Sequence, residues 1–516
     1  MITVIVNGIK YTKKIFIEYI EDLKGLIANK YLIIATSITV ALGYGFALTN
    51  SSISTDDTAV LRYLDGGELI AQGRFFPVLF NKLLGGIEFT PFWLEFIALL
   101  LIISAGLLYL CLFKKITKDK LSSACYVLFV PIFISYPLIN EIFIYNTAVI
   151  SIGVGYLLTA ISTLFVYEFV KSKNKTIVLL LIPILLMAAV VSTYESFVSV
   201  FILGLVMIIF TDRLYNYKDL GFEKGRWIKY ALAFIGVASA SILLEYVTTT
   251  AYMNAHHVVK STNAATGIVW LAASGGLTNI GPFFDSLHTS FINPIFEVFS
   301  IRILQITTLV FFIYSVVISI MRKNYWLVVF AILIILSILS LSFIQGVASP
   351  YRVCQSFALF IAFASIIIYD QTPKNAKPII VVILMYLIAM QTYDLTKWFY
   401  NDNLRYQEEK TVMLNVANQI RSKFDDTKPV VFIGEYIINP RIKKNQTNGY
   451  SFINWGMGAF SEPNTELFNF LEMHGYYLTR PTMEQLTLAR EIIPASGRWP
   501  KENSIVEYKN MVVVRF

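Results

Sequence analysis

The densest group of polar side chains follows the first long apolar segment and reads STDDTAVLRYLDGGELIAQGRFF. Its adjacent acids, Asp56 and Asp57, repel each other, so such a pair in a low-dielectric cleft needs a function or a nearby cation. A carboxylate here could accept the proton of an attacking hydroxyl group, and the pair could bind Mg²⁺ or Mn²⁺ through hard oxygens. The alternative is structural, because Ser54, Thr55 and Asp56 are all good N-cap residues for a helix over Thr58–Leu64.

Further polar residues occur later in the same loop and at the ends of later apolar segments. An acid close to the bilayer usually lines a cavity rather than facing lipid. The arginine in SPYRVCQ could hold an anionic head group with two parallel hydrogen bonds, or it could be an interfacial arginine whose charge reaches water. These further candidates are Glu68, Arg74, Glu141, Tyr194, Glu195, Lys260 and Arg352.

The elements that position these residues are long apolar blocks. The chain has 516 residues, of which 56% are hydrophobic, and segments such as Leu99–Phe113 carry no charge. A backbone inside lipid must satisfy its own hydrogen bonds, so such blocks are helices. One block alone could be a buried helix of a soluble protein, but about eleven in series predict a polytopic α-helical membrane protein. The predicted spans are 31–49, 92–113, 122–139, 144–166, 176–192, 197–211, 228–248, 302–321, 326–344, 355–370 and 377–393.

The distribution of basic residues predicts the topology. Lysines and arginines concentrate in alternate loops, which marks those loops as cytoplasmic. The N-terminus is then cytoplasmic, and an odd number of spans places the C-terminal tail outside. Two outer loops are long, at about 51–91 and 249–301. Residues 1–30 are predicted to form an amphipathic helix on the cytoplasmic membrane surface, with a helix packed on the bundle as the alternative.

The tail differs in character from the membrane module, which we predict over residues 31–394. In residues 395–516, Glu409–Phe424 has the pattern of an amphipathic helix, and Pro429–Gly434 that of a buried strand. Two helices are predicted over 464–474 and 483–493, and two strands over 504–516 with a turn at Lys509-Asn510. The tail is therefore a small extracytoplasmic α/β domain, and it contains no phosphate-binding loop or catalytic triad.

Cysteines, histidines and net charge exclude other classes of protein. The three cysteines have no metal-ligand spacing and cannot form a disulfide framework. His256 and His257 are adjacent, so on a helix they would point in different directions, which disfavours a metal site. The net charge of +8 reflects lysines in the cytoplasmic loops and does not indicate a nucleic-acid partner.

Together these features resemble a known family. The chain begins with an amphipathic helix and one span, and the first outer loop then contains S-T-D-D and Q-G-R-F. Later outer turns contain Y-P-x-x-x-E and Y-E-S, and an arginine precedes a late span. This order is similar to that of the serotype-converting glucosyltransferases of bacteria and phages, of the Gtr type II kind, within the GT-C superfamily of membrane glycosyltransferases. The resemblance covers about the first 400 residues.

The resemblance implies a reaction on the outer face of the bacterial inner membrane. A hexose, glucose by analogy, would move from a polyprenyl-phosphate donor to a surface polysaccharide such as O-antigen, with inversion and without a required cofactor. Asp56 or Asp57 would be the general base. Arg352, followed by Lys260 and Arg74, would stabilise the phosphate leaving group, while Glu141, Tyr194, Glu195 and Glu68 would line the acceptor cavity. A flippase and a donor-making glycosyltransferase would be its functional partners.

One departure and three alternatives remain open. The turn reads Tyr194-Glu195-Ser196, where glutamine is common in the family, so the extra acid could alter acceptor choice or serve as a second base. A transporter or lipid flippase would show charges at mid-membrane and repeated halves. A polysaccharide polymerase would concentrate arginines in its outer loops. A membrane scaffold would leave the Asp-Asp pair with a capping role only.

Overall fold

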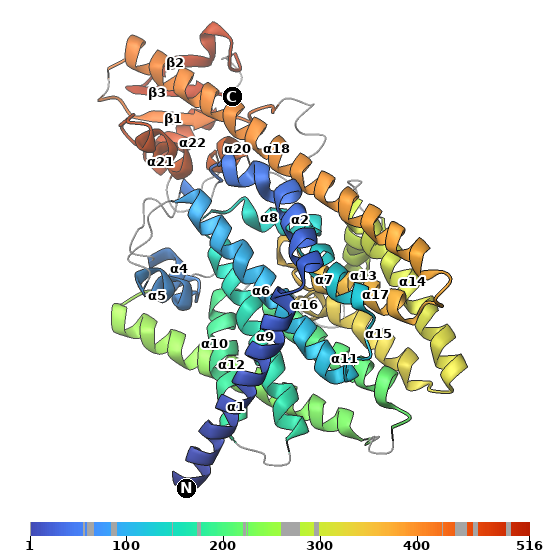
Figure 1. Ribbon diagram of the computed structural model, residues 1–516. Helices are drawn as coiled ribbons and strands as arrows, with labels where there is room; N and C mark the ends of the chain where they lie inside the picture. The colour runs from blue at the N-terminus through green and yellow to red at the C-terminus, as the bar shows by residue number, and fades with distance from the viewer. Residues whose placement is uncertain are drawn as a thin grey trace.

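The computed structural model describes residues 2–54, 57–58, 67–83, 90–146, 148–172, 177–219, 223, 225–259, 279–293, 299–425, 427–438, 451–457, 463–491 and 497–516. It is a helical bundle from which one long helix leads to a small sheet near the C-terminus (Figure 1). The end of the bundle nearest this sheet is called the tail-side end below.

The bundle and the long helix contain the following elements. They are α1 (Ile2–Ile27), α2 (Lys30–Thr49), α4 (Gly67–Ala71), α5 (Phe75–Leu83), α6 (Pro91–Thr117), α7 (Ser123–Ser135), η1 (Pro137–Ile139), α8 (Asn140–Phe143), α9 (Val149–Lys171), α10 (Val178–Thr193), α11 (Phe197–Asn216), α12 (Arg226–His256), α13 (Ile280–Leu287), η5 (His288–Ile292), α14 (Phe299–Arg322), α15 (Trp326–Ile338), α16 (Ser340–Gln345), η6 (Tyr351–Val353), α17 (Ser356–Gln371) and α18 (Lys377–Lys423).

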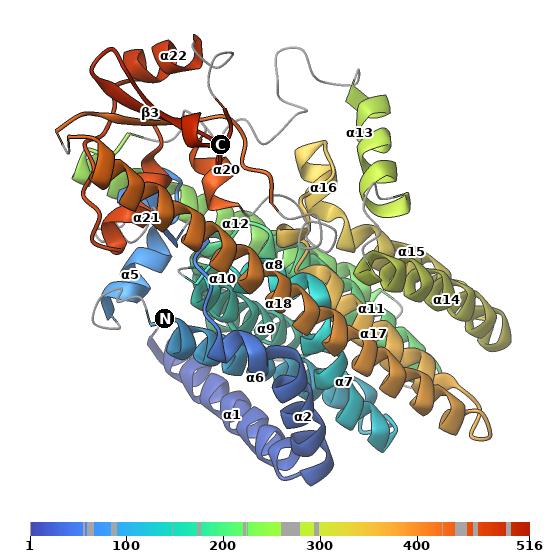
Figure 2. The same cartoon turned by 90° about the horizontal axis from the view of Figure 1, so that it is seen from above.

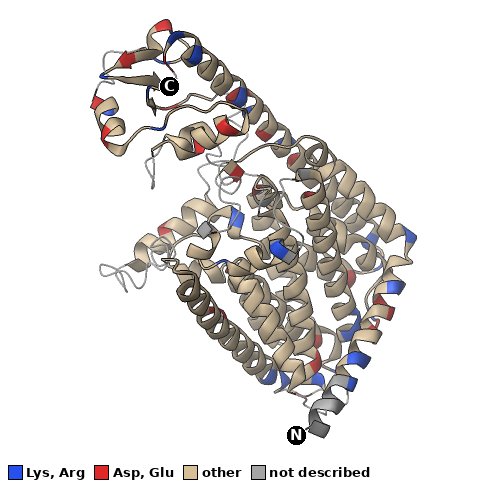
Figure 3. Cartoon of the chain, turned by 90° about the vertical axis from the view of Figure 1, so that its left-hand side faces the viewer, with Lys and Arg blue, Asp and Glu red and all other residues tan. Residues whose placement is uncertain are grey.

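The composition of these helices is that of a membrane protein. Among the described residues, seven helices are long and apolar enough to cross a membrane, namely α2, α6, α9, α11, α12, α14 and α18. The shorter apolar helices α7, α10, α15 and α17 lie at four further predicted spans. Large apolar side chains such as Leu243, Ile306 and Ile383 face outward, where lipid rather than water would cover them. Charged residues occur mainly toward the ends of the bundle (Figure 3).

Buried tyrosines connect the helices inside the bundle. Three of them donate their hydroxyl hydrogen to a backbone carbonyl of another segment, which satisfies these polar groups in the apolar interior. The pairs are Tyr44 with Ile134 at 2.6 Å, Tyr136 with Ser300 at 3.0 Å and Tyr156 with Gln355 at 2.8 Å. Helices α6 and α9 approach each other closely, because a Cβ on Gly153 would lie 2.8 Å from the Ala98 backbone.

The N-terminal helix α1 packs on the bundle. Its buried Ile15 and Tyr19 join the main apolar core, whereas Phe16, predicted on the same apolar face, is 59% exposed. Two ion pairs, Lys114 with Asp22 at 2.8 Å and Lys115 with Glu18 at 3.0 Å, attach α1 to the end of α6. These contacts agree with the alternative in which the helix packs on the bundle. The position of α1 on a membrane surface stays a prediction.

Helix α18 differs from the prediction. A span over 377–393 and a separate amphipathic helix over 409–424 were expected, but one continuous helix runs from Lys377 to Lys423. No glycine or proline occurs between these two segments, so nothing in the sequence ends the helix there. The predicted domain boundary at 394–395 therefore falls inside a helix that crosses from the bundle to the tail (Figure 2).

The tail contains a three-stranded sheet in the order β1-β3-β2. Its elements are β1 (Val430–Ile433), α20 (Phe452–Gly456), α21 (Thr465–Met473), α22 (Met483–Glu491), η8 (Glu502–Ser504), β2 (Ile505–Tyr508) and β3 (Met511–Arg515). Strand β1 is parallel to β3, with Val431 opposite Val513, and β2 is antiparallel to β3. The predicted strands and the turn are confirmed, α21 and α22 lie at the helices predicted over 464–474 and 483–493, and Lys509 and Asn510 have the positive φ angles of a tight hairpin.

The first loop of the bundle is anchored in the tail. Ile53 belongs to the same apolar cluster as Met413 of α18 and Phe432 of β1. The Asn469 side chain of α21 donates a hydrogen bond to the Thr58 carbonyl at 3.2 Å. The chain around Asp57 is thus held between the bundle and the tail.

Candidate active site

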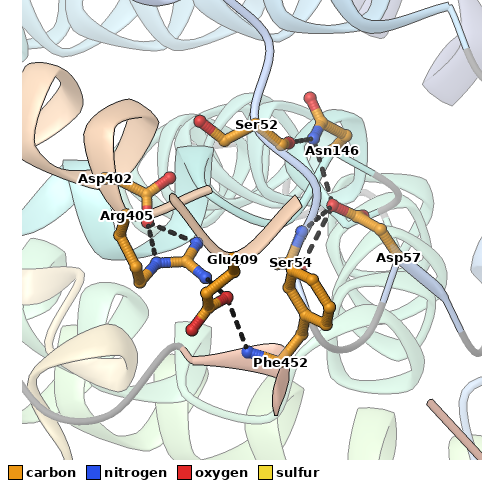
Figure 4. Close-up of polar contacts among 8 residues, drawn as sticks. All are labelled: Ser52, Ser54, Asp57, Asn146, Asp402, Arg405, Glu409 and Phe452. Carbon is orange, nitrogen blue, oxygen red and sulfur yellow. Dashed lines mark hydrogen bonds and ion pairs between the residues drawn. The ribbon is translucent and has the colours of Figure 1, made fainter. Parts of the chain in front are cut away.

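Asp57 is fully buried at the tail-side end, just after α2 (Figure 4). Its Oδ2 atom accepts hydrogen bonds from the Ser54 backbone N–H at 2.9 Å, the Ser54 hydroxyl at 3.0 Å and the Asn146 amide at 3.0 Å. A bond from a side chain back to the N–H three residues earlier is half of a capping box. The capping alternative therefore describes Asp57, whereas Asp56 lies outside the described residues.

Asn146 connects Asp57 to the preceding loop. Its amide also donates to the Ser52 carbonyl at 2.7 Å. Both partners of this nitrogen can only accept, so the orientation of the amide is fixed by the hydrogen bonds. Its Oδ1 atom points away from both partners, is buried and has no hydrogen-bond partner.

A buried ionic triad on α18 lies beside this loop (Figure 4). Arg405 is 0% exposed and bonds Asp402 Oδ1 through Nε at 3.1 Å and Nη2 at 2.7 Å. Its Nη1 atom donates to Glu409 Oε2 at 2.8 Å, and the same oxygen accepts from the Phe452 N–H at 3.3 Å. The triad joins α18 to α20 of the tail, and its formal charge is −1.

A small hollow lies between the loop and the triad. It is lined by Ala47, Asn50, Ser52, Glu95, Phe143, Ile144, Asn146, Phe399 and Asp402. Glu95, near the start of α6, is 4% exposed, and its Oε2 atom has no hydrogen-bond partner. Asp57 is close enough for its charge to act on Glu95. Four segments of the bundle and α18 therefore meet in a site rich in hydrogen-bond acceptors.

A second polar group surrounds Arg74 at the start of α5. Its guanidinium stacks on the Tyr194 ring at 5.0 Å, and the neighbouring Phe76 N–H donates to the Ser192 hydroxyl at 2.9 Å. The structure thus brings together two predicted residues, Arg74 and Tyr194. Glu195 is exposed, while the Glu68 side chain and Lys260 lie outside the described part of the chain.

A third group joins α8 to η6. Glu141 is 3% exposed, and its charge acts on Tyr351 and Cys354. Arg352, between these two residues, is exposed. The predicted phosphate-binding arginine therefore lies between two residues on which the charge of the predicted acceptor acid acts.

A model of the glucosyl transferase GtrII family matches residues 45–369. The chain belongs to the glucosyl transferase GtrII family. The comparisons found no match among curated proteins and none among solved structures. Membership makes the chain a glycosyltransferase and confirms the resemblance seen in the sequence.

The GtrII match includes most, but not all, of the candidate site. Asp57, Arg74, Glu95, Glu141 and the other bundle residues named above lie within it. The match ends before α18, so Phe399 and Asp402, which form one wall of the hollow, lie beyond the region that defines the family.

Sequence reasoning named none of the residues that line the hollow, and three of them carry the polar groups discussed here. Glu95 had a usable signal, because it is an acid at the start of an otherwise uncharged span. Asp402 belongs to the polar face of a helix, a pattern that usually indicates solvent. Asn146 had no signal, because its partner Asp57 lies 89 residues earlier in the chain.

Proposed function

We propose that this GtrII glucosyltransferase moves a hexose, which its family indicates is glucose, from a polyprenyl-phosphate donor to a surface polysaccharide such as O-antigen. The reaction would take place on the outer face of the bacterial inner membrane, with the N-terminus cytoplasmic and the tail outside. The observation that carries the proposal is the family match over residues 45–369. The polar sites at the tail-side end support it, because a lipid-linked donor keeps its chain in the bilayer and presents its head group at a membrane boundary.

The donor phosphate needs a cation, because it leaves as an anion. Arg352 is the first candidate, since it is an exposed residue between Tyr351 and Cys354, on which the charge of buried Glu141 acts. Arg74 is the second, because stacking on Tyr194 leaves the edge of a guanidinium available for oxygen ligands. Lys260 stays a sequence-based candidate.

The transfer itself is a single displacement. An acceptor hydroxyl attacks the anomeric carbon, its proton passes to a carboxylate, and the bond from that carbon to the phosphate oxygen breaks with inversion. Asp56 or Asp57 is the proposed base. Three hydrogen bonds to Oδ2 hold the Asp57 carboxylate in place.

We propose that no cofactor is required. Asp57 Oδ2 is already surrounded by three hydrogen-bond donors, and this environment does not fit a bound cation. No group of three or more His, Cys, Asp or Glu side chains in the described ranges is arranged to hold a metal ion. A second enzyme must make the donor, and a flippase must carry it across the membrane.

The experiment is transfer from polyprenyl-phosphate-glucose to cell-envelope polysaccharide by the purified full-length protein. Asp56→Asn is expected to abolish transfer in a folded protein. Asp57→Asn is expected to reduce both transfer and thermal stability, because the capping bonds change. Asp425→Asn, an exposed aspartate of the tail, is the matched control and should behave as wild type. Full activity of both Asp56→Asn and Asp57→Asn would overturn the base assignment, and inactive wild type would overturn the function.

One observation favours the alternative of a lipid-linked sugar flippase. Asp394 lies in the apolar half of α18, is 8% exposed and has an Oδ2 atom without a hydrogen-bond partner. Acids within spans often serve transport. Movement of polyprenyl-phosphate-glucose between the leaflets of protein-containing vesicles, lost in Asp394→Asn, would support the flippase, whereas sugar transfer without such movement would exclude it.

A further inference from the structure

Two acceptor atoms in the small hollow lack a donor. Glu95 Oε2 and Asn146 Oδ1 are buried, have no hydrogen-bond partner, and belong to residues that line the same hollow. Exchanging the nitrogen and oxygen of the Asn146 amide would not give its oxygen a donor, because both groups that contact the nitrogen are acceptors. A buried acceptor without a donor is costly, so the hollow is suited to a group that brings a hydrogen.

The size of the hollow restricts what this group can be. Its volume of about 10 Å³ is room for one water molecule or one hydroxyl group, and not for a sugar ring. A metal ion is disfavoured, because the described part of the chain has no suitable group of three ligands. The neighbouring Asp402 is already bonded by Arg405 and does not need a cation.

The hollow also has the right neighbours for the transfer reaction. Asn146 donates its amide nitrogen to Asp57 and also lines the hollow, so one side chain connects the two places. A sugar that placed one hydroxyl here would have its adjacent groups on the side of Asn146 that faces Asp57.

We propose that Glu95 Oε2 binds a hydroxyl group of the acceptor sugar in this hollow and thereby positions the acceptor near Asp57. The inference rests on the proposed function and adds a residue to it. Glu95 is a binding residue, and the proton of the attacking hydroxyl still passes to the aspartate pair. Water has the same hydrogen-bonding chemistry as a sugar hydroxyl, so the test must separate these two sources.

The test compares Glu95→Leu and Glu95→Gln with wild type in full-length protein. Leucine fills a similar volume and removes a buried carboxyl oxygen that has no partner, so the folded state should be at least as stable as wild type. The KM for envelope polysaccharide should rise about 10-fold in Glu95→Leu, since the hydrogen bond between the acceptor hydroxyl and the Glu95 carboxyl group is lost. The KM for polyprenyl-phosphate-glucose and its slow hydrolysis without acceptor should stay within about twofold. Glu484→Gln, an exposed residue of α22, is the control for Glu95→Gln.

Each other outcome overturns the inference in a recognisable way. An unchanged acceptor KM in both variants would exclude the binding role. Hydrolysis and transfer falling together, with the acceptor KM unchanged, would assign the hollow to water. Loss of thermal stability with both KM values raised would make Glu95 structural. Because wild-type transfer is measured in the same assay, its absence would count against the proposed function instead.

Discussion

Replacing Arg405 by methionine tests whether the buried triad holds α18 to the tail. The side chain is 0% exposed, and it is bonded to Asp402, 5% exposed, and Glu409, 0% exposed. Removing one partner of such an ion pair costs about 3–5 kcal/mol, because the remaining charges stay buried without compensation. Here two carboxylates would be left, so the upper part of that range is expected.

The assay is hydrogen exchange of backbone amides in the detergent-solubilised full chain. A loss of about 3–5 kcal/mol in the opening free energy corresponds to roughly 150- to 5,000-fold faster exchange where exchange follows the opening equilibrium. The change should appear in strands β1 and β3 and in the second half of α18, whose Met413 and Ile420 pack in the tail core. The apolar first half of α18 serves as an internal reference.

Two further variants separate charge compensation from the loss of a long side chain. Arg421→Met is the matched control, because Arg421 lies on the same helix but is exposed and stacks on Tyr476 at 4.7 Å. It should change exchange by no more than a few-fold. Arg405→Lys keeps the charge but loses the fork that reaches two carboxylates, so it should be intermediate. Equal exchange in Arg405→Met and Arg421→Met would refute the reasoning.

Two glycines provide the remaining predictions, both measured by thermal unfolding in detergent and by the monomeric fraction in size-exclusion chromatography. Gly153→Ala should lower the free energy of unfolding by about 1–3 kcal/mol, because its Cβ would meet the Ala98 backbone at 2.8 Å. The control Gly236→Ala, with no atom within 4 Å, should be neutral or slightly stabilising. Equal behaviour of the two variants would contradict the packing of α6 on α9. Gly434→Ala should lower the free energy of unfolding by at least about 1–2 kcal/mol, since the φ angle is +100° and the new Cβ would clash with the Phe516 backbone oxygen. Unchanged stability would contradict the geometry at the end of β1.

The sequence predicted those features that depend on local patterns. Uncharged blocks located the apolar helices, and an apolar run ending in glycine located β1 at Val430–Ile433. The turn at Lys509-Asn510 was also readable, because few residue pairs accept its backbone angles. The count of about eleven spans and their orientation stay predictions, since they depend on the membrane itself.

Features that depend on contacts between distant segments could not be predicted. The polar face of α18 at Asp402, Arg405 and Glu409 has the spacing of a solvent-exposed face, yet the tail buries it. The sequence suggested a catalytic role for the Asp-Asp pair, whereas in the structure Asp57 forms part of a capping box. A buried carboxyl oxygen without a hydrogen-bond partner belongs to Glu95, which the local pattern assigned to a span.

The candidate site therefore depends on the tail as well as on the family module. The GtrII match ends at residue 369, but Phe399 and Asp402 of α18 complete the hollow around Glu95 and Asn146. Asp402 is held in place by Arg405, which also binds Glu409, and Glu409 accepts a hydrogen bond from the tail at Phe452. Because these bonds form one continuous chain, loosening the tail should displace a wall of the hollow. The tail is then a structural part of the candidate site.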